Sequence, residues 1–126
     1  MKKSNQKFLV LIAFSAIALM LSVSFQAQPA KVTGTWNMAV ETSAGSGTPV
    51  FVLKQENDSI LTGTYNGQFG EAPVKGTIRV NKINLKFSAS EMDIEYTGTV
   101  DGNSMKGKVV FGTMGEGTFT GTRKEN

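Results

Sequence analysis

A two-residue alternation of apolar and polar side chains constrains the fold of this chain more than any other feature. The alternation recurs after about residue 30 in runs of roughly seven residues, which Gly, Asn, Asp and Ser separate. It is typical of β-strands that have one face in a core and one in water, whereas the apolar spacing of an amphipathic helix is absent there. The pattern predicts eight strands: 33–41, 49–56, 60–66, 74–80, 83–89, 93–100, 104–111 and 117–123.

The short connections between these strands predict how the strands pair. Each strand should pair with its neighbour in sequence, which gives a meander, and closing the meander removes its two exposed edges. We therefore predict an all-β fold: an eight-stranded antiparallel up-and-down β-barrel. The barrel is a single domain over residues 28–126, preceded by an N-terminal signal helix over residues 1–27.

A weak repeat lies inside the strand pattern: a glycine, any residue, then a larger side chain on the same inner face. Glycine weakens a strand, so its repeated use on one face predicts strands that bend tightly, as a narrow barrel requires. The copies are Gly34-x-Trp36, Gly63-x-Tyr65, Gly76-x-Ile78, Gly98-x-Val100, Gly107-x-Val109, Gly117-x-Phe119 and Gly121-x-Arg123.

The N-terminal region has the three parts of a secretory signal peptide. Lys2, Lys3 and Lys7 form a basic start, an uncharged stretch covers residues 8–23, and small and polar residues follow. The uncharged stretch is shorter than the about 20 residues that cross a bilayer. We therefore prefer cleavage after Ser24 or Ala27 to a retained membrane anchor, and expect an exported protein, periplasmic or extracellular.

Composition excludes several classes of function. The chain has 13 Lys and Arg against 10 Asp and Glu, but three of the lysines lie in the signal, so the rest is neutral and does not suggest nucleic-acid binding. Histidine and cysteine are absent, which removes most general-base, thiol and transition-metal chemistry. We expect no catalytic residue, metal site or cofactor. Only Glu71 and Glu116 would offer loop carboxylates to an enzyme, and the sequence does not pair them.

The connections differ in length, which distinguishes the two ends of the predicted barrel. In a meander, alternate connections lie at opposite ends, so the longer ones should frame one end, where ligand sites of barrels commonly lie. Phe69, Met92 and Met114 belong to these longer connections and either line a binding mouth or fold inward to fill it. The tight connections are 57–59, 81–82 and 101–103, and the connections that alternate with them, most of which are longer, are 42–48, 67–73, 90–92 and 112–116.

Gly34-Thr35-Trp36 on the first strand and Arg123 on the last resemble the calycin superfamily of lipocalins, fatty-acid-binding proteins and avidins. The resemblance implies that Arg123 packs over Trp36 where these strands meet, a cation–π contact worth roughly 0.5–2 kcal/mol. Residues 33–36 and 61–65 are most similar to the first and third strands of avidins, which makes Tyr65 a candidate ligand-binding residue. Trp36 is the only tryptophan, so the biotin-site tryptophans are absent and biotin binding is not implied.

Together these features favour a non-enzymatic binding module for a small apolar or amphipathic molecule. Its candidate ligand-binding residues are Tyr65, Phe69, Met92 and Met114, with Trp36 and Arg123 in structural roles. The alternative is a structural or protein-interaction barrel with a filled core. A homo-oligomer would be consistent with that alternative. An enzyme that uses loop carboxylates is the least favoured interpretation.

Overall fold

The computed structural model describes residues 28–125, so the predicted signal helix of residues 1–27 lies outside the described part. The described residues contain no helix, and thus none of the length and hydropathy that a bilayer crossing requires. Their strands are β1 (Gly34–Thr42), β2 (Gly45–Gly47), β3 (Val50–Glu56), β4 (Ile60–Gly67), β5 (Gly70–Arg79), β6 (Lys82–Ala89), β7 (Met92–Asp101), β8 (Ser104–Phe111) and β9 (Glu116–Arg123).

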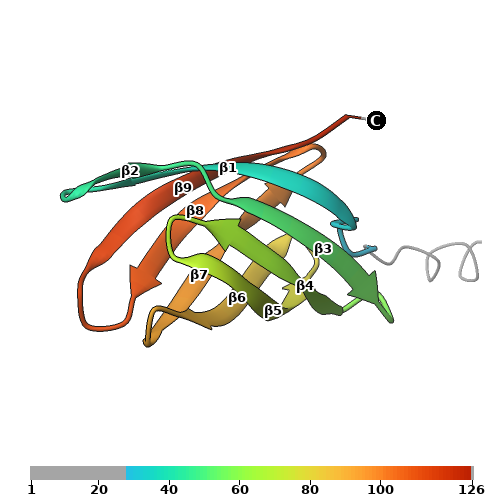
Figure 1. Cartoon of the computed structure of the whole chain (residues 1–126). Helices are drawn as coiled ribbons and strands as arrows, with labels where there is room; N and C mark the ends of the chain where they lie inside the picture. The colour runs from blue at the N-terminus through green and yellow to red at the C-terminus, as the bar shows by residue number, and fades with distance from the viewer. Residues whose placement is uncertain (1–27, 126) are drawn as a thin grey trace, which may run out of the picture.

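Eight long antiparallel strands form a closed barrel, as the sequence predicts (Figure 1). From β3 to β9 each strand pairs with the next, and β1 closes the sheet by pairing with β9 from Trp36↔Arg123 to Thr42↔Gly117. The short β2 was not predicted. It pairs with the last three residues of β1, while β3 pairs with the first four, so β2 and β3 follow one another along the same edge of β1.

The prediction of a long loop over residues 67–73 is wrong. β5 begins at Gly70, and only Gln68 and Phe69 separate it from β4. Pro73 lies within β5, although proline lacks the N–H that a central strand needs. In the structure Pro73 pairs with β4 alone, because the ladder between β5 and β6 starts only at Lys75. The connection 90–92 also shortens, to Ser90 and Glu91.

The core follows the predicted alternation, and none of its fully buried residues is polar or charged apart from two tyrosines. Phe51 lies near its centre, with edge-to-face contacts to Tyr65, Phe87 and Tyr96 at centroid distances of 5.4, 5.7 and 5.1 Å. Such aromatic pairs contribute roughly 0.5–1.5 kcal/mol each beyond the burial of their area. The rings therefore make one connected aromatic layer across the barrel.

The repeated inner glycines lie within strands and let neighbouring backbones approach closely. Gly98 and Gly107 are cross-strand partners. A Cβ atom on Gly107 would collide with the carbonyl oxygen of Thr97, and one on Gly98 with that of Lys106. These glycines are therefore required by the tight coiling of the sheet, as the repeat predicts.

One end of the barrel, here called the closed end, is covered by residues 30–33, the closing segment. Val32 is completely buried, and its N–H donates to Gln55 Oε1 at 2.8 Å. Gln55 Nε2 in turn donates to the Ala30 carbonyl at 3.1 Å, and the Ala30 N–H donates to the Val80 carbonyl at 2.6 Å. Residues 30–33 thus fill this end of the barrel.

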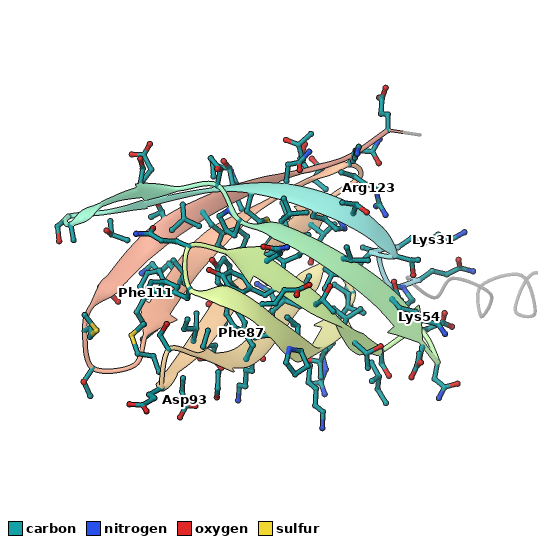
Figure 2. All side chains as sticks on the ribbon, in the orientation of Figure 1. Lys31, Lys54, Phe87, Asp93, Phe111 and Arg123 are labelled. Carbon is teal, nitrogen blue, oxygen red and sulfur yellow. The ribbon has the colours of Figure 1, made fainter. Side chains whose placement is uncertain are left out.

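Trp36 and Arg123 fasten the closing segment to the barrel. The indole Nε1 donates to the Val32 carbonyl at 2.9 Å, and the Arg123 guanidinium lies 4.5 Å above the centroid of the Trp36 ring. The guanidinium also donates to the carbonyls of Lys31 and Thr33, both at 2.6 Å. Figure 2 shows Arg123 and Lys31 together at this end of the molecule. The contact that the calycin resemblance implies is therefore present.

Candidate ligand-binding pocket

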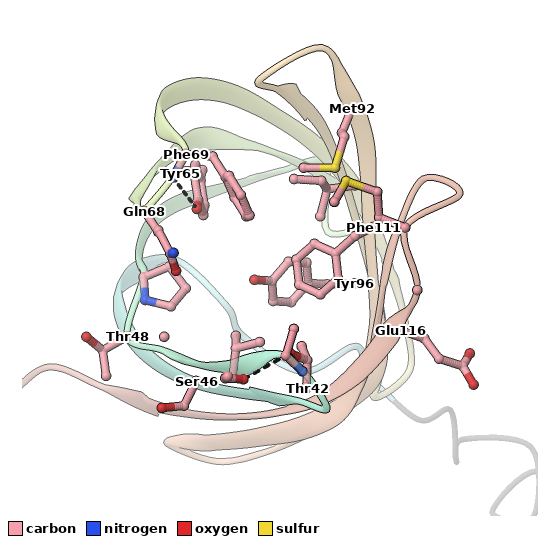
Figure 3. A pocket seen from close by; sticks show the side chains of 18 of the residues that line it. Thr42, Ser46, Thr48, Tyr65, Gln68, Phe69, Met92, Tyr96, Phe111 and Glu116 are labelled. Carbon is pink, nitrogen blue, oxygen red and sulfur yellow. Dashed lines mark hydrogen bonds between the residues drawn. The ribbon is translucent and has the colours of Figure 1, made fainter.

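A cavity of about 300 Å³ opens at the end opposite the closing segment, which we call the mouth. Four connections surround the mouth: residues 43–49, which include β2, and residues 68–69, 90–91 and 112–115. Figure 3 looks into this opening. Volumes of this order, with mostly apolar walls, are typical of small-molecule sites.

Aromatic rings form the floor and one wall of the cavity. The Tyr65 and Phe87 rings are stacked with centroids 4.4 Å apart, and Tyr96 packs beside Phe87 at 6.0 Å. Nearer the mouth, the rings of Phe69 and Phe111 lie 6.1 Å apart. Rings in this arrangement offer flat apolar surfaces against which a planar ligand can stack.

Two tyrosine hydroxyls lie at the inner part of the cavity. That of Tyr65 accepts a hydrogen bond from the Phe69 N–H at 3.4 Å. That of Tyr96 points into the open space, and Figure 3 draws no hydrogen bond from it to the other pocket residues. Among residues 28–125 no fully buried side-chain oxygen lacks a partner, so this hydroxyl is accessible from the cavity although only 2% of Tyr96 is exposed.

Burial also determines the protonation of both phenols. It raises the pKa of Tyr96 strongly above its ordinary value of 10.0, and the neighbouring Tyr65 raises it further. Burial likewise raises the pKa of Tyr65, an effect that the hydrogen bond from Phe69 partly offsets. Both groups therefore remain neutral at physiological pH, and the Tyr96 hydroxyl is available as a hydrogen-bond donor.

The opposite wall is the polar segment that carries β2. The Thr42 hydroxyl donates to the Gly45 carbonyl at 2.9 Å and accepts from the Ala44 N–H at 3.1 Å, which fixes the turn at its tip. Ser46, Thr48 and Gln68 add polar groups along this side of the opening (Figure 3). The pocket therefore has an apolar floor and a partly polar rim.

All four candidate ligand-binding residues line this cavity. Tyr65 is in its floor, Phe69 and Met92 pack partly buried against the core, and Met114 is 78% exposed at the rim. The sequence left open whether these side chains line a mouth or fill it. In the structure they line the opening and leave a cavity. Their role in binding stays a prediction.

Sequence reasoning missed three large side chains of the pocket: Phe87, Tyr96 and Phe111. Phe87 and Tyr96 belong to the inner parity of their strands, so the alternation assigned them to the core. Counting inward positions from the mouth-side strand ends would have shown that they face the cavity.

The carboxylates do not form a catalytic pair. Glu116 lines the cavity, whereas Glu71 lies beside a groove on the outside of the barrel. On the outer face of β7, Asp93 accepts from the Ser88 hydroxyl at 2.7 Å, and Glu95 lies 3.4 Å from Lys86 Nζ. Within residues 28–125 no three acidic side chains come together as a cation site would require.

Comparisons with known proteins identify the fold. No protein-family model matches the chain, and no curated protein matches it in sequence. A redesigned β-barrel is 16% identical, with a TM-score of 0.62 over 74% of this chain and 91% of that chain. Another redesigned barrel, mFAP1, solved bound to DFHBI, is 11% identical, with a TM-score of 0.58 over 73% of this chain and 94% of that chain.

A fatty-acid-binding protein of Echinococcus granulosus is 12% identical, with a TM-score of 0.48 over 74% of this chain and 97% of that chain. At these identities the likeness is one of fold alone. The two redesigned barrels therefore show only that the chain has the fold of a small closed antiparallel β-barrel. Its resemblance to calycins, and to avidins in particular, stays a prediction.

Proposed function

We propose that this protein is an exported, non-enzymatic barrel that binds a small apolar or amphipathic molecule at its mouth. The observation that carries the proposal is the contrast between the ends: the chain fills the closed end with Val32, and leaves a cavity with an aromatic floor at the mouth. Barrel mouths with apolar walls and a few polar groups are favoured ligand sites.

The solved neighbours support this proposal at the level of the fold. A redesigned barrel with the same architecture was solved with DFHBI bound, so a barrel of this kind can take a guest molecule. The stacked pair Tyr65 and Phe87 and the accessible Tyr96 hydroxyl would together hold and orient a flat molecule.

The export part of the proposal depends on the basic and uncharged segments at the N-terminus. Both proposed cleavage positions, after Ser24 and after Ala27, precede the closing segment, so the mature chain would keep the residues that fill the closed end. The intact mass of protein recovered from the exported fraction tests this. A chain that begins at Phe25 or Gln28 is expected, and a full-length chain held in the membrane fraction would contradict it.

Binding itself is tested by titration with N-pentyl dansylamide, a neutral fluorescent aromatic molecule. We expect enhanced, blue-shifted emission with saturation, and a rise in the melting temperature that grows with probe concentration. Phe87→Ala, which removes half of the stacked pair, should weaken the binding, whereas Lys124→Ala at the far end is the matched control. No saturable emission change and no thermal shift would favour the filled-core interaction barrel instead.

A further inference from the structure

The charged residues of the barrel are distributed unevenly between the two ends. Five carboxylates and no Lys or Arg lie within two residues of the four mouth connections, which gives the mouth a formal charge of −5. The other described residues carry the compensating positive charge. We call these five residues the acidic rim: Glu41, Glu71, Glu91, Asp93 and Glu116.

Every lysine and arginine of residues 28–125 lies on the barrel wall or at the closed end. On their strands, Lys86 and Lys108 come nearest to the mouth, and each is three residues from the mouth-side end of its strand. Lys86 is already paired with Glu95 at 3.4 Å. Figure 2 shows Lys31, Lys54 and Arg123 toward one end and Asp93 toward the other. Lysines do lie beside one member of the acidic rim, because Glu41 shares a groove on the outer wall with Lys106 and Lys108.

The cavity also lacks a group that could receive an anion. Glu116 is the one charged side chain among its lining residues, and it is negative. A carboxylate or sulfonate drawn into this pocket would lose its hydration without gaining a cationic partner, which is costly. An amine at the opening would instead remain hydrated and lie in the negative field of the acidic rim, although the Glu116 side chain points away from the cavity (Figure 3).

A second, independent observation points to a ligand in the same cavity. Tyr96 is only 2% exposed, and its hydroxyl points into the cavity and has no partner among the drawn pocket residues (Figure 3). A donor of this kind gains from a ligand acceptor at the inner end of the cavity. The floor thus favours an uncharged hydrogen-bond acceptor on the ligand, and the rim favours a positively charged group.

From this arrangement we infer that the pocket selects a cationic amphiphile and discriminates against fatty acids and other anionic amphiphiles. The selected molecule has an apolar or aromatic body with a hydrogen-bond acceptor, and a basic amine that stays in water at the negatively charged mouth. This inference rests on the proposed binding function and specifies its ligand class. Attraction across the rim also weakens with salt, because the carboxylates are exposed.

Three dansyl probes with the same fluorophore and different tails test the inference. Dansylcadaverine carries an amine, N-pentyl dansylamide is neutral, and 6-(dansylamino)hexanoic acid carries a carboxylate. We expect affinity to fall in that order, with the amine bound roughly tenfold or more tightly than the carboxylate at low salt, and less than that at 0.5 M NaCl. Equal affinities for the amine and the carboxylate, or a preference for the carboxylate, would overturn the inference.

Two variants assign the preference to the acidic rim. Glu116→Gln should reduce the ratio of amine to carboxylate affinity by about two- to fivefold, since one rim charge is removed. Asp101→Asn removes a carboxylate at the closed end and should leave the ratio unchanged. If both variants change the ratio equally, net charge and not the rim sets the preference, and the assignment to the rim is wrong.

Tyr96→Phe tests the contribution of the floor to affinity independently of the contribution of the rim. All three probes carry the same sulfonyl acceptor, so loss of the hydroxyl should weaken all three by a similar factor, about three- to tenfold, and keep their ratio. A change confined to the amine probe would contradict the assigned acceptor site. If none of the three probes binds the wild-type protein, the proposed binding function itself fails, a result distinct from equal binding of all three.

Discussion

The two ends of this barrel are built from the same eight strands but fill their interiors differently. At the closed end, Val32 enters the barrel and hydrogen bonds from Trp36, Gln55 and Arg123 hold the closing segment in place. At the mouth, the strand ends carry aromatic and methionine side chains that leave a cavity of about 300 Å³. The comparison teaches that one barrel can fill one end with a segment of its own chain and leave a cavity at the other.

The largest effect on stability is expected for a substitution of Trp36 at the closed end. Trp36→Ala should lower the free energy of unfolding by about 3–5 kcal/mol, because it empties a fully buried site and removes the support of both Val32 and Arg123. Urea titration followed by far-UV circular dichroism measures the loss. A loss below about 1 kcal/mol would show that the closed end does not carry the stability assigned to it.

Arg123 should have the next largest effect. Arg123→Lys keeps the charge but loses the planar fork that reaches the Lys31, Thr33 and Gly102 carbonyls together, so a loss of about 1–3 kcal/mol is expected. The neighbouring Lys124→Ala is the control, because its side chain is exposed and should cost less than about 0.5 kcal/mol. Equal urea midpoints for the two variants would show that the hydrogen bonds of the guanidinium do not stabilise the closed end.

Alkaline pH should lower the stability of the protein through Tyr96, which lies in the floor of the pocket. The pKa of Tyr96 is raised above the value of 10.0 that the group has when unfolded, so above about pH 10 the unfolded chain releases the phenol proton before the folded one does. Its contribution to stability is therefore complete below pH 10 and is lost above it, at roughly 1.4 kcal/mol per pH unit.

Urea midpoints between pH 8 and 11 check this alkaline effect. Lysines also titrate in that range, so Tyr96→Phe, which keeps every lysine, is the matched control. The wild-type protein should lose more stability than this variant as the pH rises. Parallel curves for the two proteins would mean that folding does not raise the pKa of Tyr96.

The smallest effect on stability is expected at the rim of the mouth. Met114→Ala truncates a side chain that is 78% exposed, so the free energy of unfolding should change by less than about 0.5 kcal/mol. The affinity for N-pentyl dansylamide should nevertheless fall about two- to fivefold, because Met114 lines the opening. A stability loss comparable with that of Trp36→Ala would break the contrast between the ends.

The alternation carried enough information to predict the eight strands and the barrel, and Gly34-x-Trp36 together with Arg123 indicated the contact that closes it. Other features depended on the three-dimensional arrangement. Pro73 is tolerated in β5 only because β5 and β6 separate there. The closing segment has no periodic pattern by which the sequence could have indicated it. The surroundings of the Tyr96 hydroxyl depend on how the strands tilt, which alternation does not specify. Residue patterns therefore indicated the framework, whereas the depth of the pocket depends on how the strands are arranged in space.

The central claim is that the mouth binds and the closed end does not. Amide and indole chemical shifts of isotope-labelled protein, recorded during titration with N-pentyl dansylamide, test it most directly. We expect saturable shifts clustered at Phe69, Met92 and Met114, with the Val32 amide and the Trp36 indole unchanged. Shifts concentrated at Val32 and Trp36, or no saturable shift at the mouth, would contradict it.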